Sequence, residues 1–429
     1  MVIKSGRNID HVINVYKKKK MINISKPWIE KVGDKVYLKS HIKDDYQNID
    51  EDIWYSTPEE YGHYFCDEIA DAFVISVLLQ AIRYGEDIVV DAAISEKLYF
   101  NLQFSLIHTI SISWGDISNK IKVTPKEVMK PNFHSFAVGC GCSLGVDSLS
   151  AIFRYTSKEC PESYRITHLT YFNVGAMGYK DLEKAQSSFK KDLSMVRDFA
   201  DAYKLPLVCI ESNISILYRD FDFDQSGIIR NMSAVLSMQK LFRVYYFASG
   251  QPNQNFEFTT TVMSHYGSLL LPLMSTESTE LVVADQDKSR IDKTKSLMDN
   301  PIAHQHLYVC WKELIANKHP QSEIARVKDK FLNCTRCDKC LRTALTLDIL
   351  GKLNLFKEIF DLDYYYRVRD KYICKVLLNK DKSFMYRDIV LLMEQVHFPI
   401  SARVKRELFL KRSIIYRISS TAYHKICKK

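Results

Sequence analysis

Two stretches of the sequence combine residue types and spacings that can support chemistry. The first spans residues 139–148, where glycines, serines and two cysteines surround an aspartate at position 147. A short apolar run comes before this stretch and a segment with helical character follows it, so we predict a strand, a tight turn and a helix start. Such a turn presents free backbone N–H groups and the positive end of a helix dipole, which together favour binding of a phosphate.

The second stretch holds three cysteines at metal-ligand spacing, Cys334, Cys337 and Cys340. We predict Cys310, in a segment with strand character, as the fourth ligand. Four thiolates around one Zn²⁺ fill its tetrahedral shell and leave no position for water, so the site would be structural. The spacing alone leaves two alternatives open, an iron–sulfur cluster and free structural thiols.

Three basic residues lie among or directly after these cysteines, namely Arg336, Lys339 and Arg342. Four thiolates on one divalent ion carry an excess of negative charge. We expect the three basic side chains to offset that excess.

Three kinds of nucleotide-binding loop could use the turn within residues 139–148. A Walker loop ends in Gly-Lys followed by Ser or Thr, but no lysine occurs within residues 135–154. A dinucleotide-binding fold needs an acidic residue at the end of the second strand, where this chain has Asn173. The third kind fits the residues, and an ordinary strand-to-helix turn without a ligand stays open as the alternative.

Residues 143–148 read Ser-Leu-Gly-Val-Asp-Ser and resemble the Ser-Gly-Gly-x-Asp-Ser motif of the PP-loop ATP pyrophosphatases. In that superfamily the loop binds the β- and γ-phosphates of ATP, while a substrate oxygen attacks the α-phosphate and releases pyrophosphate. In this chain Leu replaces the first glycine of the motif. The resemblance implies that Asp147 holds Mg²⁺ and that Asn173 lies at the adenine-binding edge. It implies an ATP site formed by Ser143, Leu144, Gly145, Val146, Asp147 and Ser148.

The cysteine pattern extends the resemblance. One cysteine, a gap, then Cys-x-x-Cys-x-x-Cys and a following arginine resemble the zinc site of the 7-cyano-7-deazaguanine synthases, a family of PP-loop enzymes. In that family an ATP-activated carboxylate reacts with ammonia to give an amide and then a nitrile. The resemblance covers residues 134–350, with a longer gap after Cys310, and implies a structural Zn²⁺ on the four cysteines. It also places Arg290 and Lys293 where they would neutralise charge at the phosphoryl transition state.

We therefore expect an ATP-dependent enzyme that adenylates a carboxylate or carbonyl oxygen of a small-molecule or macromolecular acceptor and passes it to a nitrogen nucleophile. The nitrogen is expected to come from free ammonia, an amine or a separate subunit, because position 2 is Val and not the cysteine of an N-terminal-nucleophile glutaminase. Two alternatives remain open. One is a PP-loop sulfur transferase that acts on tRNA with Cys140 or Cys142 as the sulfur carrier, and the other is a non-catalytic nucleotide-binding scaffold.

Alternation of strands and helices after residue 132 predicts an α/β fold with a doubly wound parallel sheet of the PP-loop type. We expect a small α/β N-terminal domain at 1–131, the PP-loop domain at 132–330, a helical zinc-bearing region at 331–400 and a basic tail at 401–429. The expected strands are 87–91, 121–124, 134–139, 166–173, 205–210 and a segment around 268–273. The expected helices are 67–83, 95–110, 147–156, 181–203 and 231–247, and residues 1–50 are expected to form an extension with a short hairpin.

Composition and charge narrow the expected partners and compartment. The net charge of +9 lies mostly in residues 401–429, which hold nine Lys or Arg against one acid. We expect RNA or another acidic partner to bind this tail. No apolar run approaches the ~18 residues of a membrane span, and the start of the chain has no apolar core of signal-peptide length. We therefore expect a cytoplasmic protein whose eleven cysteines serve as thiols and metal ligands.

Overall fold

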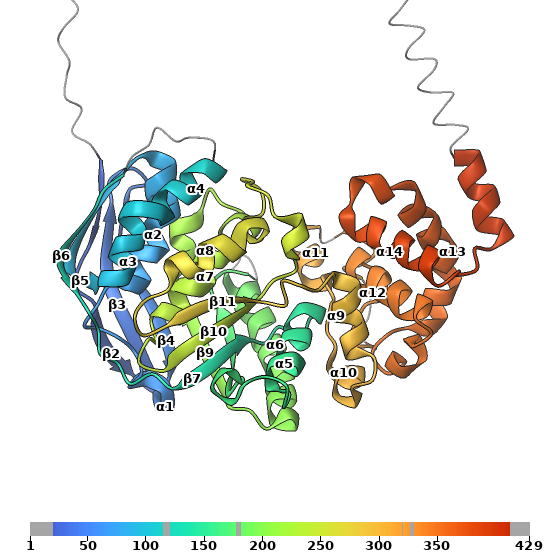
Figure 1. The fold of residues 1–429 in the computed structure, drawn as a ribbon, viewed down its shortest axis with the longest axis horizontal. Coiled ribbons are helices and arrows are strands. Elements are labelled where there is room, and N and C mark those ends of the chain that lie inside the picture. Colours follow the sequence, from blue (N-terminus) through green and yellow to red (C-terminus); the bar gives the residue numbers. More distant parts are fainter. Residues whose placement is uncertain (1–19, 115–120, 177–181, 320, 327–329, 412–429) are drawn as a thin grey trace, which may run out of the picture.

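The computed structural model describes residues 20–114, 121–176, 182–319, 321–326 and 330–411 (Figure 1). The strands are β1 (Met21–Ile24), β2 (Trp28–Val32), β3 (Lys35–Asp44), β4 (Ile49–Pro58), β5 (Asp87–Ser95), β6 (Val123–Met129), β7 (Ala137–Gly141), β8 (His168–Asn173), β9 (Leu207–Ser212), β10 (Phe242–Ala248) and β11 (Glu280–Ala284). The helices are α1 (Glu59–Gly62), α2 (Asp71–Tyr84), α3 (Glu96–Asn101), α4 (Ile107–Ser113), α5 (Val146–Thr156), α6 (Leu182–Tyr203), α7 (Phe223–Leu236), α8 (Gly267–Met274), α9 (Arg290–Leu297), α10 (Pro301–His306), α11 (Lys312–Lys318), α12 (Asp338–Ile349), α13 (Leu362–Leu378) and α14 (Phe384–Gln395).

All eleven strands of the described residues belong to one sheet. Their order is β11-β10-β7-β8-β9-β4-β3-β1-β5-β6, and β2 pairs with β3 outside this path. The strands from β11 to β9 are parallel to one another, and so are β1, β5 and β6. Antiparallel pairs connect these two groups through β4 and β3. The chain is therefore an α/β protein with a large, mostly parallel sheet, as the alternation of elements predicted.

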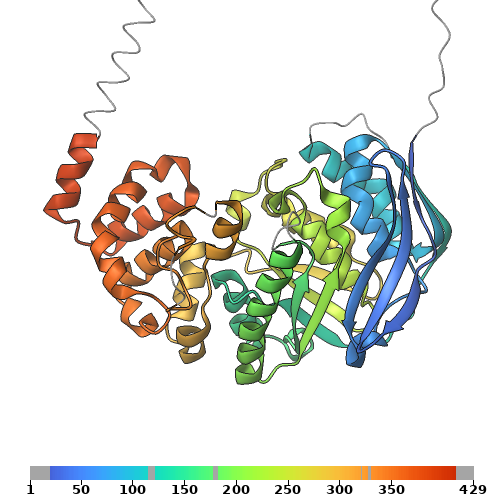
Figure 2. The same cartoon turned by 180° about the vertical axis from the view of Figure 1, so that it is seen from behind.

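The sheet continues across the boundary expected near residue 131. Its two parts meet where β4 pairs with β9, through Tyr55 opposite Ser212 and Ser56 opposite Glu211. The N-terminal strands therefore extend the sheet of the following region, and Figures 1 and 2 show them in blue beside the central green strands.

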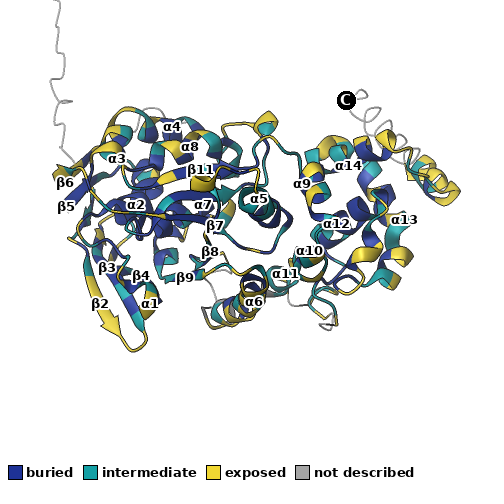
Figure 3. Cartoon of the chain, turned by 60° about the horizontal axis from the view of Figure 1, so that its bottom comes forward, coloured by how far each residue is buried: buried dark blue, intermediate teal, exposed yellow. Residues whose placement is uncertain are grey.

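Helices cover both faces of the parallel strands. Successive side chains of a strand point to opposite faces, and the neighbours Tyr245 and Tyr246 of β10 accordingly belong to two different hydrophobic clusters. The first cluster includes residues of α2, α7 and α8, and the second includes residues of α5, α6 and α9. Figure 3 shows the buried residues gathered in these layers, while β2 is mostly exposed at the edge.

Several expected elements are confirmed. The turn that carries residues 139–148 follows β7 and leads into α5, and α6 matches the helix expected at 181–203. The helix expected at 95–110 is present as α3, a π-helical turn at Leu102–Leu106 and α4. The helix α2 ends before Gly85, whose φ of 69° provides the left-handed C-cap that glycine favours.

Two expectations between residues 231 and 284 are wrong. The helix expected at 231–247 ends at Leu236, and β10 follows, because residues 242–247 are rich in aromatic and β-branched side chains that favour strands. The strand expected around 268–273 is instead the leucine-rich helix α8, which includes Pro272. One edge strand of the sheet is β11, which the sequence pattern did not predict.

The expectation for residues 1–50 is confirmed in part, because β2 and β3 form a hairpin, but the rest of the described part is not an extension. Residues 20–50 contribute β1, β2, β3 and the start of β4. In β3 the side chains of Val36, Leu38, Ser40 and Ile42 are buried in alternation with less buried neighbours, as expected for a strand with one face on the core. Residues 1–19 lie outside the described residues.

The region expected to be helical at 331–400 contains α12, α13 and α14, drawn in orange and red in Figure 1. Residues 412–429, which hold most of the basic tail, lie outside the described residues. Within the described part of the chain, no helix combines the length and the apolar character that crossing a membrane requires.

Candidate functional site

The expected phosphate loop lies between the end of β7 at Gly141 and the start of α5 at Val146. It closes on itself through side-chain hydroxyls. Ser143 Oγ and Ser148 Oγ lie 3.2 Å apart, and Ser148 Oγ donates to the carbonyl of Gly145 at 3.1 Å. The loop thus lies at the carboxyl end of a central parallel strand, where open α/β sheets bind their ligands.

Leu144 adopts a φ of 58°, in the left-handed region. A side chain with a Cβ pays about 1–2 kcal/mol for this conformation, whereas glycine adopts it freely. The Leu144 side chain is buried in the second hydrophobic cluster, which offsets the strain. Leu144 therefore keeps the backbone conformation for which glycine would be the unstrained choice.

Asp147, in the first turn of α5, meets two basic residues from α9, which begins 143 residues later. Arg290 Nη1 donates to Asp147 Oδ2, and Lys293 Nζ lies 3.6 Å from Asp147 Oδ1. The Lys293 side chain is only 1% exposed and that of Arg290 11%. The structure thus brings together the three residues predicted as catalytic, which lie far apart in sequence.

Local contacts fix this arrangement. Ser289 caps α9 by accepting from the amide of Asp292, which sets the direction of the first turn. Lys293 Nζ donates to the carbonyl of Ser249 at 2.5 Å, and a Cβ at the adjacent Gly250 would lie 3.6 Å from Asp147 Oδ2. The segment after β10, which the sequence did not point to, therefore forms one wall of the site.

The charges in this site act on one another. Burial raises the pKa of Asp147, but the charges of Arg290, Lys293 and Lys339 outweigh it and hold that pKa below its usual value. Burial lowers the pKa of Lys293, and Asp147 opposes that effect. Asp147 is therefore ionised at neutral pH, and its Oδ1 is buried without a hydrogen-bond partner among the described residues.

Asn173 lies at the carboxyl end of β8, the neighbour of β7 in the sheet. Its side-chain amide donates to Gln186 Oε1 at 3.1 Å, and Gln186 in turn donates to Glu211. Lys35 of β3 completes this network through an ion pair of 2.6 Å with Glu211. Asn173 thus lies at the sheet edge predicted for adenine, and a hydrogen-bond network that includes an N-terminal strand holds its side chain.

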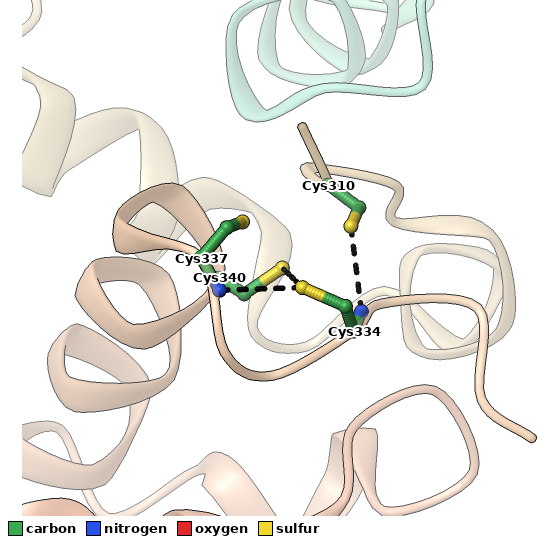
Figure 4. Close-up of side chains that lie close together, drawn as sticks. All are labelled: Cys310, Cys334, Cys337 and Cys340. Atoms are coloured by element: carbon green, nitrogen blue, oxygen red, sulfur yellow. Dashed lines mark hydrogen bonds between the residues drawn. The ribbon is translucent and has the colours of Figure 1, made fainter. Parts of the chain in front are cut away.

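The four predicted metal ligands converge (Figure 4). The sulfur atoms of Cys310, Cys334, Cys337 and Cys340 all lie within 4.8 Å of one another. Cys334 Sγ and Cys340 Sγ are 3.8 Å apart, and four sulfurs at 2.3 Å from a central Zn²⁺ would lie about 3.8 Å apart. The donor set and its spacing therefore fit a tetrahedral metal ion such as zinc.

Backbone N–H groups donate to two of the four sulfurs. The amides of Arg336 and Cys337 donate to Cys334 Sγ at 3.4 and 3.3 Å, and the amide of Cys334 donates to Cys310 Sγ at 3.4 Å. Thr335, with a φ of 55°, makes the tight turn that aims these amides. Hydrogen bonding from Cys310 lowers the pKa of Cys337 to about 7. Such donors favour the thiolate form that a metal requires.

The strand expected around Cys310 is absent, since Cys310 lies in the irregular segment between α10 and α11. This segment is fixed in two directions. Asn333 accepts from the amide of Val309 and donates to the carbonyl of Leu307, both at 2.8 Å, which joins it to the residue before Cys334. The amide of Tyr308 donates to the carbonyl of Leu144 at 2.9 Å. The cysteine cluster and the phosphate loop are therefore directly connected.

The three basic residues near the cysteines have different partners, and of the three only Lys339 has a described charge interaction with one of the four thiolates, that of Cys337. Arg336 donates to the carbonyl of Cys334 and pairs with Asp361 at 3.3 Å. Lys339 lies over the ring of Trp311, and its charge acts on Asp147 and on Arg290. Arg342 is buried and also close enough to Arg290 for their charges to interact. Lys339 therefore also belongs to the Asp147 site, and Arg342 interacts with the Arg290 of that site.

A cavity of about 270 Å³ adjoins the cysteine cluster. Tyr308, Cys310 and Cys334 form part of its wall, and the side chains of Lys191 and Glu313 form another part. It lies next to the segment that connects the cluster to the phosphate loop.

Comparison of the chain with protein-family models, curated proteins and solved structures finds no match. What the site can do therefore follows from its own geometry. That geometry consists of a group of cations around Asp147 and a four-cysteine cluster, connected through Tyr308.

Proposed function

We propose that the chain is an ATP-dependent enzyme of the PP-loop type, related to the 7-cyano-7-deazaguanine synthases. It adenylates a carboxylate or carbonyl oxygen, releases pyrophosphate and passes the activated group to a nitrogen nucleophile. The observation that carries the proposal is the meeting of Arg290 and Lys293 with Asp147 at the end of β7.

Two features of this meeting support a triphosphate ligand. Arg290 and Lys293 are nearly buried, so their charges lack solvent and favour an anion. The loop at residues 143–148 leads into the N-terminus of α5, where backbone N–H groups and the helix dipole attract phosphate oxygens. Ser143 and Ser148 add hydroxyl donors at the same place.

Mg²⁺ bound with ATP would offset the charge of the phosphates and orient them. Asp147 is the residue that would hold it, because its Oδ1 is buried without a hydrogen bond among the described residues. Arg290 and Lys293, now paired with Asp147, would turn to the phosphate oxygens. They would stabilise the charge that develops on the leaving pyrophosphate.

In the proposed reaction a substrate oxygen attacks the α-phosphorus of ATP and the bond to the bridging oxygen of the β-phosphate breaks. Pyrophosphate leaves with that electron pair. For a carboxylate, ammonia or an amine then attacks the carbonyl carbon of the acyl adenylate, AMP leaves and one proton is released. Asn173 would face the nucleotide base at the adjoining sheet edge.

A structural Zn²⁺ on the four cysteines is part of the proposal. Four sulfur ligands leave no open position on the metal, so its role is to fix α12 and the Cys310 segment. Cys310 precedes the other three ligands by at least 24 residues, so the metal would link two separate segments of the chain.

The alternative of a sulfur transferase gains little from the geometry. Cys140 and Cys142, its candidate sulfur carriers, are buried. Burial raises the pKa of Cys142 to about 12 and that of Cys140 well above its usual value. A protonated, inaccessible thiol is a poor nucleophile.

Nucleotide binding tests the proposal against the scaffold alternative. ATP and an α,β-non-hydrolysable analogue are titrated into the full chain in a calorimeter, with Arg290→Gln and the matched control Lys295→Gln. Lys295 lies on the same helix but is 40% exposed and pairs with Asp292. We expect Arg290→Gln to weaken ATP binding at least about tenfold and the control to leave it unchanged. Binding of both nucleotides without any turnover would favour the scaffold.

A further inference from the structure

The helix α12 carries two basic residues one turn apart, Lys339 and Arg342, directly beside two of the cysteines. Cys337 is the N-cap of α12 and Cys340 lies in its first turn. Residues three apart on a helix share one face. The same turn of helix therefore presents metal ligands and basic side chains.

Arg342 is buried without a full set of partners. Its side chain is 11% exposed, and its Nε has no hydrogen-bond partner among the described residues. The nearest carboxylate oxygen, Asp338 Oδ2, is 3.8 Å from Nη1, too far for a hydrogen bond. Asp338 is in addition bonded by Lys375 at 2.6 Å and by Tyr386 at 2.6 Å. A buried guanidinium with a free donor is costly unless a ligand supplies an acceptor.

The neighbours of Arg342 make an anion the fitting ligand. α12 packs against α9, whose Arg290 is near enough for the two guanidinium charges to repel. Lys339 acts on Arg290 and Asp147 as well. Three cations from two helices, Arg290, Lys293 and Lys339, thus act on one carboxylate, Asp147, and Arg342 lies close enough to Arg290 for their charges to interact. Asp285, which also interacts with Lys293, is already paired with Arg154 at 3.0 Å.

We propose that Arg342 and Lys339 form the second half of a polyphosphate site whose first half is Arg290 and Lys293, and that the cysteine-bound metal positions them there. This inference rests on the proposed function, since its ligand is the triphosphate of ATP or the leaving pyrophosphate. The metal acts as a positioning element, because Arg342 follows the ligand Cys340 by only two residues. The hydrogen bond from Tyr308 to Leu144 connects the other side of the cluster to the loop.

A consequence is that metal and pyrophosphate stabilise each other's binding, because coupling between two sites is reciprocal. Pyrophosphate should therefore slow the loss of zinc from the cluster. A metal with a purely local structural role would be released at the same rate with or without the anion.

The test uses the zinc-loaded full chain and inorganic pyrophosphate as the probe. Its affinity is measured by calorimetry for the wild type, for Arg342→Gln and for the matched control Arg336→Gln. Arg336 lies between the same cysteines but pairs with Asp361. In a second measurement, zinc transfer to a coloured chelator is timed with and without pyrophosphate. Zinc content and melting temperature of each variant establish that it is folded.

We expect Arg342→Gln to weaken pyrophosphate binding about 10- to 100-fold, as for loss of a hydrogen bond between charged groups. Pyrophosphate should slow zinc release from the wild type and from Arg336→Gln, and not from Arg342→Gln. If Arg342→Gln is not folded, the more exposed Lys339→Gln serves in its place, with a weaker affinity expected.

Equal affinity and equal zinc release in the wild type and in the folded Arg342→Gln or Lys339→Gln variant would overturn this inference and leave the proposed function standing. A wild type that binds neither pyrophosphate nor ATP would overturn both.

Discussion

The backbone amide of Tyr308 donates a 2.9 Å hydrogen bond to the carbonyl of Leu144. Tyr308 lies two residues before the metal ligand Cys310, and Leu144 lies in the loop at the end of β7. The bond holds together two segments that are 164 positions apart in sequence. Because Leu144 is in the left-handed conformation, its carbonyl has a direction that an ordinary turn residue would not give it. The two chemical features of the chain therefore depend on each other's backbone geometry.

Leu144 gives a prediction on stability, in which the usual order of Ala and Gly variants is reversed. In most positions an Ala variant is more stable than a Gly variant, but a left-handed residue reverses the order because only glycine avoids the Cβ strain. We expect Leu144→Ala and Leu144→Gly both to be less stable than the wild type, with the Gly variant more stable than the Ala variant by about 1 kcal/mol. Chemical denaturation of the three proteins measures this, and an Ala variant more stable than the Gly variant would show that the loop is not strained.

Asp147→Asn should remove Mg²⁺-dependent pyrophosphate release while keeping the fold. The same change frees Arg290 and Lys293 from their carboxylate partner, so metal-free pyrophosphate should bind roughly three- to tenfold more tightly. Asp292→Asn, an exposed change on α9, is the matched control and should alter neither quantity. Turnover and calorimetry check the prediction, with circular dichroism as the test of folding. An Asp147→Asn protein with full pyrophosphate release would remove Asp147 from the mechanism.

Cys337→Ser should abolish stoichiometric metal binding and lower the melting temperature by at least about 5 °C. The control Cys160→Ser changes a buried thiol outside the cluster and should keep about one zinc ion per chain. Metal analysis of freshly purified protein and thermal unfolding give both results. Iron with visible absorbance in place of zinc would contradict the structural zinc site and favour the sulfur-transfer alternative.

Asp192 gives a prediction on pH. Burial raises the pKa of this carboxyl to about 6, although Tyr171 donates to it at 3.3 Å. A folded-state pKa above the unfolded value means that Asp192 favours the folded state below pH 4 and loses this contribution as the pH rises through 6. Asp192→Asn should therefore be more stable than the wild type at pH 8, by about 1–3 kcal/mol, with no gain at pH 4. Thermal or urea unfolding at the two pH values tests this prediction. An equal difference in stability between the variant and the wild type at both pH values would show that Asp192 does not titrate as described.

Much of the site could be predicted from local sequence because each part is a short motif. The strand, turn and helix around Asp147 occupy twenty contiguous residues, and three of the four cysteines lie within seven. Their types and spacing determine local geometry directly. The pairing of Asp147 with Arg290 and Lys293 could also be predicted, because a carboxylate and cations that become buried need partners of opposite charge.

What the sequence did not reveal depends on long-range contacts. Nothing near Arg342 in the sequence predicts that its charge interacts with Arg290 on another helix. Beyond a short hairpin, the N-terminal strands were not predicted, because in β3 the buried positions alternate with mostly basic residues, which resembles a polar extension until the partner strands are known. The helix α8 was read as a strand because a short apolar run has no decisive period.

The most direct test of the proposed function is the identity of the nucleotide products. The full chain is incubated with ATP, Mg²⁺, ammonia and a panel of carboxylic acids, and the phosphorus NMR spectrum is followed. We predict acid-dependent formation of AMP and pyrophosphate in equal amounts, and no formation of either in the Asp147→Asn protein. Formation of ADP and inorganic phosphate with every acid would contradict attack at the α-phosphorus and with it the proposed function.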